Sequence, residues 1–372
     1  MFGLNTIKAL GSEARQLGVK KAFVVTDPGV IKADLLRPMK DSLESAEVPY
    51  LIYDQVEPEP PVQCVEETTK QFKSEGCDLV IGIGGGSSLD VAKGVSIMAT
   101  NQGSVLDMCG VDLVKKEGAR KILIPTTAGT GSEVTRVFVV TDEKDNTKKV
   151  VNSLYALSDM AIVDPLLTLT MPPKVTADTG MDALVHLIES YVSMNATPFS
   201  DILAEKPIQL IARYLPMAWA KGSNLEARYF LSLAATMGGM AFASGGLGAV
   251  HALAYSIGTE YHLSHGRSNA VMLTHVMRFN LSGKPDKYAA IAALMGKDIE
   301  GLSAPEAAQL SVEAVEELLT TLQISFHLRD YGISKEDITK LVEGGMKYSR
   351  LFITNPRDLN AGDVRSLYEE AY

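Results

Sequence analysis

The sequence contains little cysteine. Its 372 residues include only Cys64, Cys77 and Cys109, and no two of these form a Cys-x-x-Cys pair. An odd number of cysteines at such spacings excludes a complete disulfide framework. We therefore expect reduced thiols and a cytoplasmic protein.

Positive charge and long apolar runs are also scarce. The 35 Lys and Arg residues are outnumbered by 45 Asp and Glu residues, which gives a formal net charge of -10. This balance provides no basic surface for nucleic acid or for an anionic membrane. No apolar run reaches the ~18–20 residues of a membrane-spanning helix, and the start of the chain lacks the pattern of a signal peptide. We expect a protein with no nucleic-acid or membrane partner that acts on a small molecule.

The length of the chain indicates two domains, because a single hydrophobic core tends to stop growing at ~250–300 residues. In the first half, short β-rich runs alternate with helical patterns. Strands are expected over 21–27, 50–54, 78–83, 121–125 and 159–164, and helices over 31–46, 62–74 and 88–100. This alternation predicts an α/β domain with a parallel, Rossmann-like sheet covered by helices on both faces. Two further runs, 136–141 and 148–152, flank the turn-rich segment 142–146 and predict a hairpin.

The pattern changes at Met171-Pro-Pro, which we take as the domain boundary. Beyond it the β-branched runs disappear and helical periodicity takes over. Helices are expected over 177–192, 201–220, 225–243, 267–280, 304–322 and 335–348. The sequence therefore predicts an α/β domain over residues 1–170 and an all-α domain over residues 171–372.

Three consecutive glycines, Gly84, Gly85 and Gly86, followed by Ser87, connect the expected strand 78–83 to the next helix. Glycines let the backbone approach an anion closely, and the helix start offers unpaired N–H groups to a phosphate. The spacing departs from the dinucleotide fingerprint, because Ser87 takes the place of its third glycine and the loop follows the third strand instead of the first. A phosphate site and a tight turn without a ligand both agree with these residues.

A second loop of small polar residues, 125–133, follows the fourth strand and contains Thr126 and Thr127. Ligands of open α/β sheets bind outside the carboxyl ends of the strands, so the two loops together predict one nucleotide site. Asp27 also follows a strand. A carboxylate there can accept hydrogen bonds from ribose hydroxyls and repel a 2′-phosphate, which favours NAD over NADP. The alternative is that Asp27 caps the turn before Pro28.

Three of the six histidines, His251, His262 and His265, lie in the glycine-rich and apolar stretch 246–266. A buried imidazole needs a partner for each ring nitrogen, and a metal ion can provide one. Asp182 and His186 lie four residues apart on an expected helix, so both side chains project from the same face. Joined to His251 and His265, they form a three-histidine, one-aspartate set that suits Fe²⁺ or Zn²⁺ better than Mg²⁺ or Ca²⁺.

These residues resemble the iron-dependent, or group III, alcohol dehydrogenases of the dehydroquinate synthase-like fold. The resemblance covers nearly the whole chain and rests on several motifs in the same order. They are Val25-Thr-Asp27, Gly84 to Asp90 with Lys93, Pro125 to Glu133, Asp164-Pro165, Thr179 to Glu189, and Gly246 to His251.

The resemblance implies a dinucleotide-binding first domain and a metal- and substrate-binding second domain. It implies that the metal ligands are Asp182, His186, His251 and His265. It implies that NAD contacts Asp27, Gly84, Gly85, Gly86, Ser87, Thr126, Thr127 and Lys149. The implied activity is hydride transfer between NAD(H) and a short-chain alcohol or aldehyde, with the metal polarising the substrate oxygen. Family likeness favours Fe²⁺, although Zn²⁺ accepts the same ligands, and it implies a homo-oligomer, a dimer or larger.

One position departs from the family pattern. Many members carry histidine four residues after the third ligand, where it is thought to help move the alcohol proton, whereas this chain has Tyr255. A tyrosine with an ordinary pKa near ~10 is a poor base at neutral pH. Tyr255 and His262 are therefore the two candidate catalytic residues for proton transfer.

Arg267, two residues after ligand His265, leaves the substrate class open. If it faces the substrate, it can pair with a carboxylate or sulfonate on a short aldehyde, and otherwise it is a surface residue at a helix start. Two other activities compete with the dehydrogenase. A dehydroquinate synthase-like lyase would call for a Lys and Arg cluster and a glutamate ligand, and a non-catalytic protein would bind NADH without turnover. A zinc glycerol dehydrogenase usually offers two histidines and an aspartate.

Overall fold

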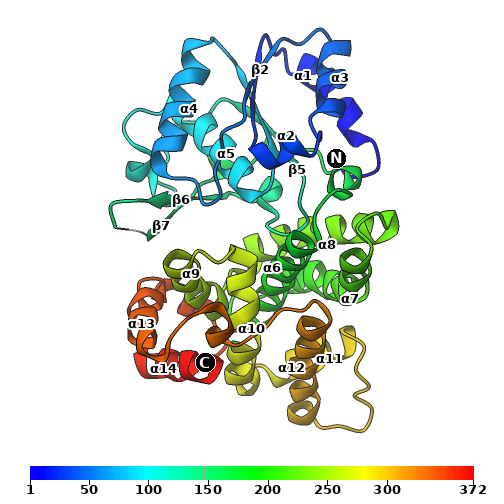
Figure 1. The fold of residues 1–372 in the computed structure, drawn as a ribbon, viewed down its shortest axis with the longest axis vertical. Coiled ribbons are helices and arrows are strands. Elements are labelled where there is room, and N and C mark those ends of the chain that lie inside the picture. Colours follow the sequence, from blue (N-terminus) through cyan, green and yellow to red (C-terminus); the bar gives the residue numbers. More distant parts are fainter. Residues whose placement is uncertain (146) are drawn as a thin grey trace. The chain divides into compact units, whose positions relative to one another are not determined.

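The chain folds into two compact units, Met1–Thr170 and Met171–Tyr372. The computed structural model describes residues 1–145 and 147–372. Asn146, the last residue of the expected hairpin turn, lies outside the described residues. Figure 1 draws unit 1 from blue to green and unit 2 from green to red.

Unit 1 is built on a five-stranded parallel sheet with the order β2-β1-β3-β5-β8. Its strands are β1 (Ala22–Val25), β2 (Tyr50–Tyr53), β3 (Leu79–Gly84), β5 (Arg120–Pro125) and β8 (Met160–Ala161). Its α-helices are α1 (Leu10–Gln16), α2 (Pro28–Lys32), α3 (Arg37–Ser45), α4 (Val62–Ser74) and α5 (Gly86–Thr100). Because β1 pairs with both β2 and β3, the winding direction reverses between β1 and β3, and a crevice at such a switch point is where open α/β sheets bind ligands.

Both faces of this sheet are covered, as the sequence predicted. Phe23 and Val25 of β1 point into a core formed with α4 and α5. The alternate residues Ala22 and Val24 point into a second core formed with α1 and α3. Continuous apolar strands of this kind are expected for a sheet that is buried on both sides.

The predicted hairpin forms, with β6 (Val137–Asp142) antiparallel to β7 (Thr147–Asn152). A short strand that was not predicted, β4 (Gly110–Val111), adds to β7 and completes a three-stranded sheet. The single helix expected over 31–46 was wrong. It is divided into α2 and α3 because Asp34 takes a left-handed conformation (φ 53°) and Pro38 opens a new helix.

Unit 2 is all-α, as predicted: every regular element between residues 171 and 372, a range that the structure describes completely, is a helix. Its α-helices are α6 (Pro173–Val192), α7 (Pro198–Ala220), α8 (Leu225–Gly245), α9 (Ala249–Tyr261), α10 (His265–Asn280), α11 (Pro285–Leu294), α12 (Ala304–Thr321), α13 (Ile338–Met346) and α14 (Ala361–Ala371). The sequence patterns missed α9, α11 and α14.

In the described residues, no single helix is both long and apolar enough to cross a membrane. One pair, α8 with α9, passes the test of length and composition together and is bent by 113° at its break.

Candidate functional site

Four side chains of unit 2 converge on one point: Asp182 and His186 from α6, His251 from α9, and His265 from α10. Each offers one ligand atom, and these atoms all lie within 4.8 Å of one another. Asp182 Oδ1 is 3.6 Å from His265 Nε2 and 4.0 Å from His186 Nε2. Ligand atoms held tetrahedrally at about 2.1 Å from one ion lie about 3.4 Å apart, so the group has the size of a metal centre. The structure thus brings together the four ligands expected from the sequence.

The local sequence explains why the ligands meet. Asp182 and His186 lie on successive turns of α6 and on the same face of that helix. The turn before α9 uses Gly246 in a conformation (φ 86°) that other residues rarely adopt, and His251 then falls in the first turn of α9. His265 is the first residue of α10, and Ser264 caps that helix by accepting a hydrogen bond from the Arg267 N–H at 3.4 Å.

Burial prepares these residues for a divalent metal. Asp182, His186 and His251 are all buried, and the side chain of His265 is 35% exposed. Burial lowers the pKa of His186 to about 4, which keeps this imidazole neutral and able to ligate at neutral pH. Among the described residues, His186 Nδ1 is a buried nitrogen with no hydrogen-bond partner. Three imidazoles and one carboxylate form a donor set that fits Fe²⁺ or Zn²⁺.

Glu189, which was not assigned a role from the sequence, fixes the orientation of His251. Its Oε2 is 2.6 Å from His251 Nδ1, and its Oε1 accepts a hydrogen bond from the Val250 N–H at 2.6 Å. A carboxylate on Nδ1 leaves the Nε2 lone pair free for a metal. Glu189 lies one turn beyond His186 on α6, so helical spacing from that ligand could have identified it.

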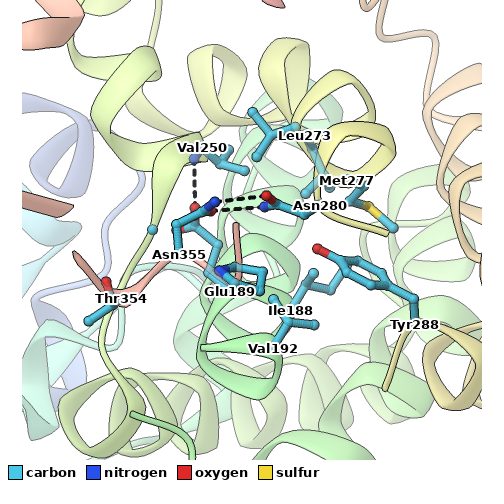
Figure 2. Close-up of a pocket in the computed structure, with 13 residues that line it drawn as sticks. Ile188, Glu189, Val192, Val250, Leu273, Met277, Asn280, Tyr288, Thr354 and Asn355 are labelled. Carbon is cyan, nitrogen blue, oxygen red and sulfur yellow. Dashed lines mark hydrogen bonds between the residues drawn. The ribbon is translucent and has the colours of Figure 1, made fainter. Parts of the chain in front are cut away.

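Figure 2 shows the small cavity behind Glu189. It leaves about 10 Å³ for the centre of a water molecule, which is room for about one. Asn280 and Asn355 close one wall through two reciprocal amide hydrogen bonds of 2.8 and 2.7 Å. Glu189 itself is buried, so its hydrogen bonds to Val250 and His251 are largely shielded from bulk water.

Aromatic rings pack against the histidines. His186 stacks on His251 with ring centroids 4.9 Å apart, and it also contacts Phe242 at 4.7 Å. Tyr255 stacks on His265 at 5.4 Å with an interplanar angle of 16°. Burial raises the pKa of Tyr255, so its phenol is neutral at neutral pH and can donate a proton but not accept one.

The structure does not bring His262 into this group. His262 is exposed and ends α9 in a left-handed conformation (φ 54°). Arg267 is neither at the surface nor free. Its side chain is 14% exposed and pairs with Asp178, with Nε 2.7 Å from Asp178 Oδ1.

In unit 1, the residues expected to bind nucleotide gather at the switch point of the sheet. Asp27 follows β1 and caps α2 by accepting the Val30 N–H at 3.1 Å, so the capping interpretation holds. Its other oxygen accepts a hydrogen bond from Ser88 Oγ of the glycine loop at 2.9 Å. A Cβ at Gly84 (φ 154°) would lie 2.6 Å from Ser88 Oγ, so only glycine permits this turn.

The second loop lies directly beside the first. The Thr126 N–H donates to the Gly84 carbonyl at 2.9 Å, and a Cβ at Gly85 would meet Thr127 at 3.6 Å. The helix that follows, α5, has Gly85 as its N-cap and no side-chain cap, so its first N–H groups are available to an anion.

Lys149 lies on β7 of the hairpin, where its Nζ is 2.5 Å from Asp145 Oδ2. Its neighbour Lys148, which sequence reasoning missed, is connected to the glycine loop. Lys148 Nζ pairs with Glu59 at 2.9 Å, and the Glu59 N–H donates to Ser87 Oγ at 3.3 Å.

Asp90 on α5 anchors both the second loop and the hairpin. It accepts hydrogen bonds from Ser132 Oγ at 2.7 Å and from the Val139 N–H at 2.9 Å. Lys93, one turn further, is fully buried and donates to the Val137 carbonyl at 2.7 Å. Both residues lie in a motif that the resemblance had marked, but no role had been assigned to them.

Unit 1 has a parallel sheet with a glycine loop at its switch point, and unit 2 is helical and carries a group of three histidines and an aspartate. This combination is typical of metal-dependent dehydrogenases. The sequence pattern of iron-containing alcohol dehydrogenase matches residues 1–165, and that of the C-terminal part of the Fe-containing alcohol dehydrogenase family matches residues 176–372. The chain belongs to this family. It is therefore an oxidoreductase of the alcohol dehydrogenase and aldehyde reductase type.

Individual relatives span the whole chain. The 1,3-propanediol dehydrogenase of Citrobacter freundii is 40% identical over 373 residues, covering 100% of this chain and 96% of that protein. The sulfoacetaldehyde reductase of Bilophila wadsworthia is 35% identical over 371 residues, covering 99% and 96%. The crystal structure of a 1,3-propanediol oxidoreductase superposes with a TM-score of 0.97 at 39% identity, covering 100% of this chain and 97% of that one.

Proposed function

We propose that the protein transfers hydride between NAD(H) and a short, neutral alcohol or aldehyde, with a divalent metal held by Asp182, His186, His251 and His265. The observation that carries the proposal is the convergence of these four ligand atoms within 4.8 Å. Family membership favours Fe²⁺ as the metal. When bound, such a metal supplies Lewis acidity to the substrate oxygen.

The protein's own groups prepare the metal site for this chemistry. Glu189 holds His251 in the tautomer that leaves Nε2 available, and burial keeps His186 neutral. Glu189 is buried, which limits competition from solvent for its carboxylate.

NAD is the proposed hydride carrier, bound by Asp27, Gly84 to Ser87, Thr126, Thr127 and Lys149. Support comes from the contacts between the two loops at the switch point and from the uncapped start of α5. The Asp27 carboxylate favours NAD over NADP, because a 2′-phosphate beside it would meet a like charge. Lys149 is the weakest member of this set, since Asp145 already pairs with its ammonium group.

Tyr255 is the better candidate for moving the alcohol proton. Its ring lies against ligand His265, and a phenol that stays protonated can give its proton to the oxygen of a reduced aldehyde. His262 is a weaker candidate, because it is exposed at the end of α9.

A neutral substrate is favoured over an acidic one. The alternative, a short aldehyde with a carboxylate or sulfonate, draws support from Arg267 and from the sulfoacetaldehyde reductase relative. Asp178 pairs with Arg267, however, and a paired guanidinium attracts an anionic substrate less strongly. A dehydroquinate synthase-like lyase has less support, since both family matches are to dehydrogenases.

The decisive experiment is anaerobic purification with metal analysis, followed by NADH oxidation against a panel of neutral and acidic short aldehydes. We expect one divalent metal per chain and the fastest turnover with neutral aldehydes. Protein that binds both metal and NADH but reduces no aldehyde would contradict the proposed function. Light scattering on the same preparation tests the homo-oligomer expected from family membership.

A further inference from the structure

Asn269 of α10 lies among the four proposed ligands, although nothing in its sequence context marked it. It is completely buried and lies one helical turn after His265. Gly266 makes this position possible, because a Cβ there would lie 2.0 Å from the Asp178 carbonyl oxygen of α6. The glycine lets α10 approach α6 closely and turns Asn269 toward Asp182.

The side-chain amide of Asn269 touches three of the four ligand atoms. Its Nδ2 is 2.8 Å from Asp182 Oδ1, 3.2 Å from His265 Nε2 and 3.3 Å from His251 Nε2. Each of these acceptors directs a lone pair into the space that a metal would occupy. The amide has two hydrogens, so it can satisfy the aspartate and one histidine at a time.

The carbonyl oxygen of the Asn269 side chain does not tie the amide to any other group among the described residues. Within residues 1–145 and 147–372, Asn269 Oδ1 is a buried oxygen without a hydrogen-bond partner. The orientation of this side chain is therefore set by the ligands alone, and the ligands in turn are oriented by the amide. Glu189 orients His251 in a similar way, through the ring nitrogen Nδ1 on the side away from Asn269.

We propose that Asn269 is a positioning residue for the metal, which holds Asp182 and the two histidines in their binding arrangement before the metal arrives. The inference rests on the proposed metal centre. Without metal, the amide donates to the converging lone pairs, of which those of Asp182 and His251 are buried and need a hydrogen-bond partner. When metal binds, it takes the histidine lone pairs, while Asp182 has enough lone pairs to keep its hydrogen bond to the amide.

The test compares Asn269→Leu, which keeps the branched shape of the side chain but removes the donor, with Asn101→Leu in unit 1. Asn101 is also a buried asparagine, but its amide donates to the Ile97 and Lys116 carbonyls and not to a ligand. The dissociation constant for Co²⁺ is measured by competition with a chromophoric chelator, and the visible Co²⁺ bands report the ligand arrangement. We expect Asn269→Leu to weaken Co²⁺ binding about 10- to 100-fold and to change the bands, and Asn101→Leu to do neither.

Each other outcome is decisive. Unchanged Co²⁺ affinity and bands in Asn269→Leu, or equal losses in both variants, would overturn the role of Asn269 while leaving the metal centre intact. Wild-type protein that binds no Co²⁺ would overturn the metal centre as well. Asn269→Ala carries the same expectation and replaces the leucine variant if that variant does not fold.

Discussion

We expect one side chain, Asp27, to decide whether the first unit prefers NADH or NADPH. Asp27 lies between the glycine loop, through Ser88, and the start of α2, through Val30. Asp27→Asn keeps a helix cap and removes the charge, so we expect kcat/KM for NADPH relative to NADH to rise about tenfold. Steady-state kinetics with both cofactors measures the ratio. Asp34→Asn, which suits the left-handed conformation of Asp34, is the matched control and should leave the ratio unchanged.

Tyr255 and His262 are the two candidates for proton transfer, and the sequence alone could not rank them. We expect Tyr255→Phe to retain its metal and to lower aldehyde reduction about a hundredfold, because the ring remains against His265 but the hydroxyl is lost. His262→Asn should leave turnover unchanged, since asparagine tolerates the left-handed conformation at this helix end. Metal analysis and single-turnover rates check both variants. Full activity of Tyr255→Phe would place the proton path elsewhere.

The cysteines should be unreactive in the folded protein. Burial raises the pKa of Cys109 to about 11 from an ordinary 9.0, and the pKa values of Cys64 and Cys77 are raised in the same way. At pH 8 the thiolate of Cys109 is about a hundredfold scarcer than that of an ordinary cysteine, and its alkylation should slow accordingly. The rate should rise about tenfold per pH unit up to pH ~10. Mass spectrometry of iodoacetamide labelling measures it, and rapid labelling of Cys109 at pH 8 would contradict the burial argument.

At the scale of helices and strands, sequence patterns worked where periodicity was strong and failed where special backbone geometry intervened. The buried strands β1, β3 and β5 were predicted because their apolar runs are short and uninterrupted. The break between α2 and α3 was missed although Pro38 marks the start of a new helix, and no pattern signals that Asp34 adopts a positive φ. The helix α9 was missed because polar residues and Gly258 interrupt its apolar pattern, although it carries His251.

The same contrast holds at the candidate site. The four-residue spacing of Asp182 and His186, the histidine cluster of residues 246–266 and the family resemblance together identified all four proposed ligands. Helical spacing placed Glu189 on the ligand face of α6, but its contact with His251 of α9 became apparent only in the structure. The contact of Asn269 with Asp182 likewise joins two helices that are distant in sequence, and such contacts leave no periodic signal.

The close approach of α6 and α10 at Gly266 can be tested by substituting this glycine. Gly266→Ala would place a Cβ 2.0 Å from a backbone oxygen, whereas a Cβ at Gly238 inside α8 meets nothing closer than 3.5 Å. We expect Gly266→Ala to lower the free energy of unfolding by ~1–3 kcal/mol and to weaken metal binding. Gly238→Ala should raise the free energy of unfolding by ~0.5–1 kcal/mol. Urea denaturation and Co²⁺ titration measure these effects, and a harmless Gly266→Ala would show that the helices can separate without affecting the ligands.

At the scale of the whole molecule, the two proposed cofactors use residues of different units. Metal at 1,000 times its Kd should stabilise the unit that binds it by about 4 kcal/mol. In hydrogen exchange, we therefore expect the metal to protect α6, α9 and α10 of unit 2. NADH should instead protect the loops after β1, β3 and β5 of unit 1. Metal-dependent protection confined to the sheet of unit 1 would contradict the assignment.

The order of the ligands along the chain has a consequence for synthesis of the protein in the cell. Asp182 and His186 emerge from the ribosome first, and α7 and α8 must follow before His251 and His265 can join them. A nascent chain that stops between these helices carries half of a metal site and cannot hold the ion firmly. In the proposed site the ligand set is therefore complete only after α10 has left the ribosome, and we expect the metal to enter after that point.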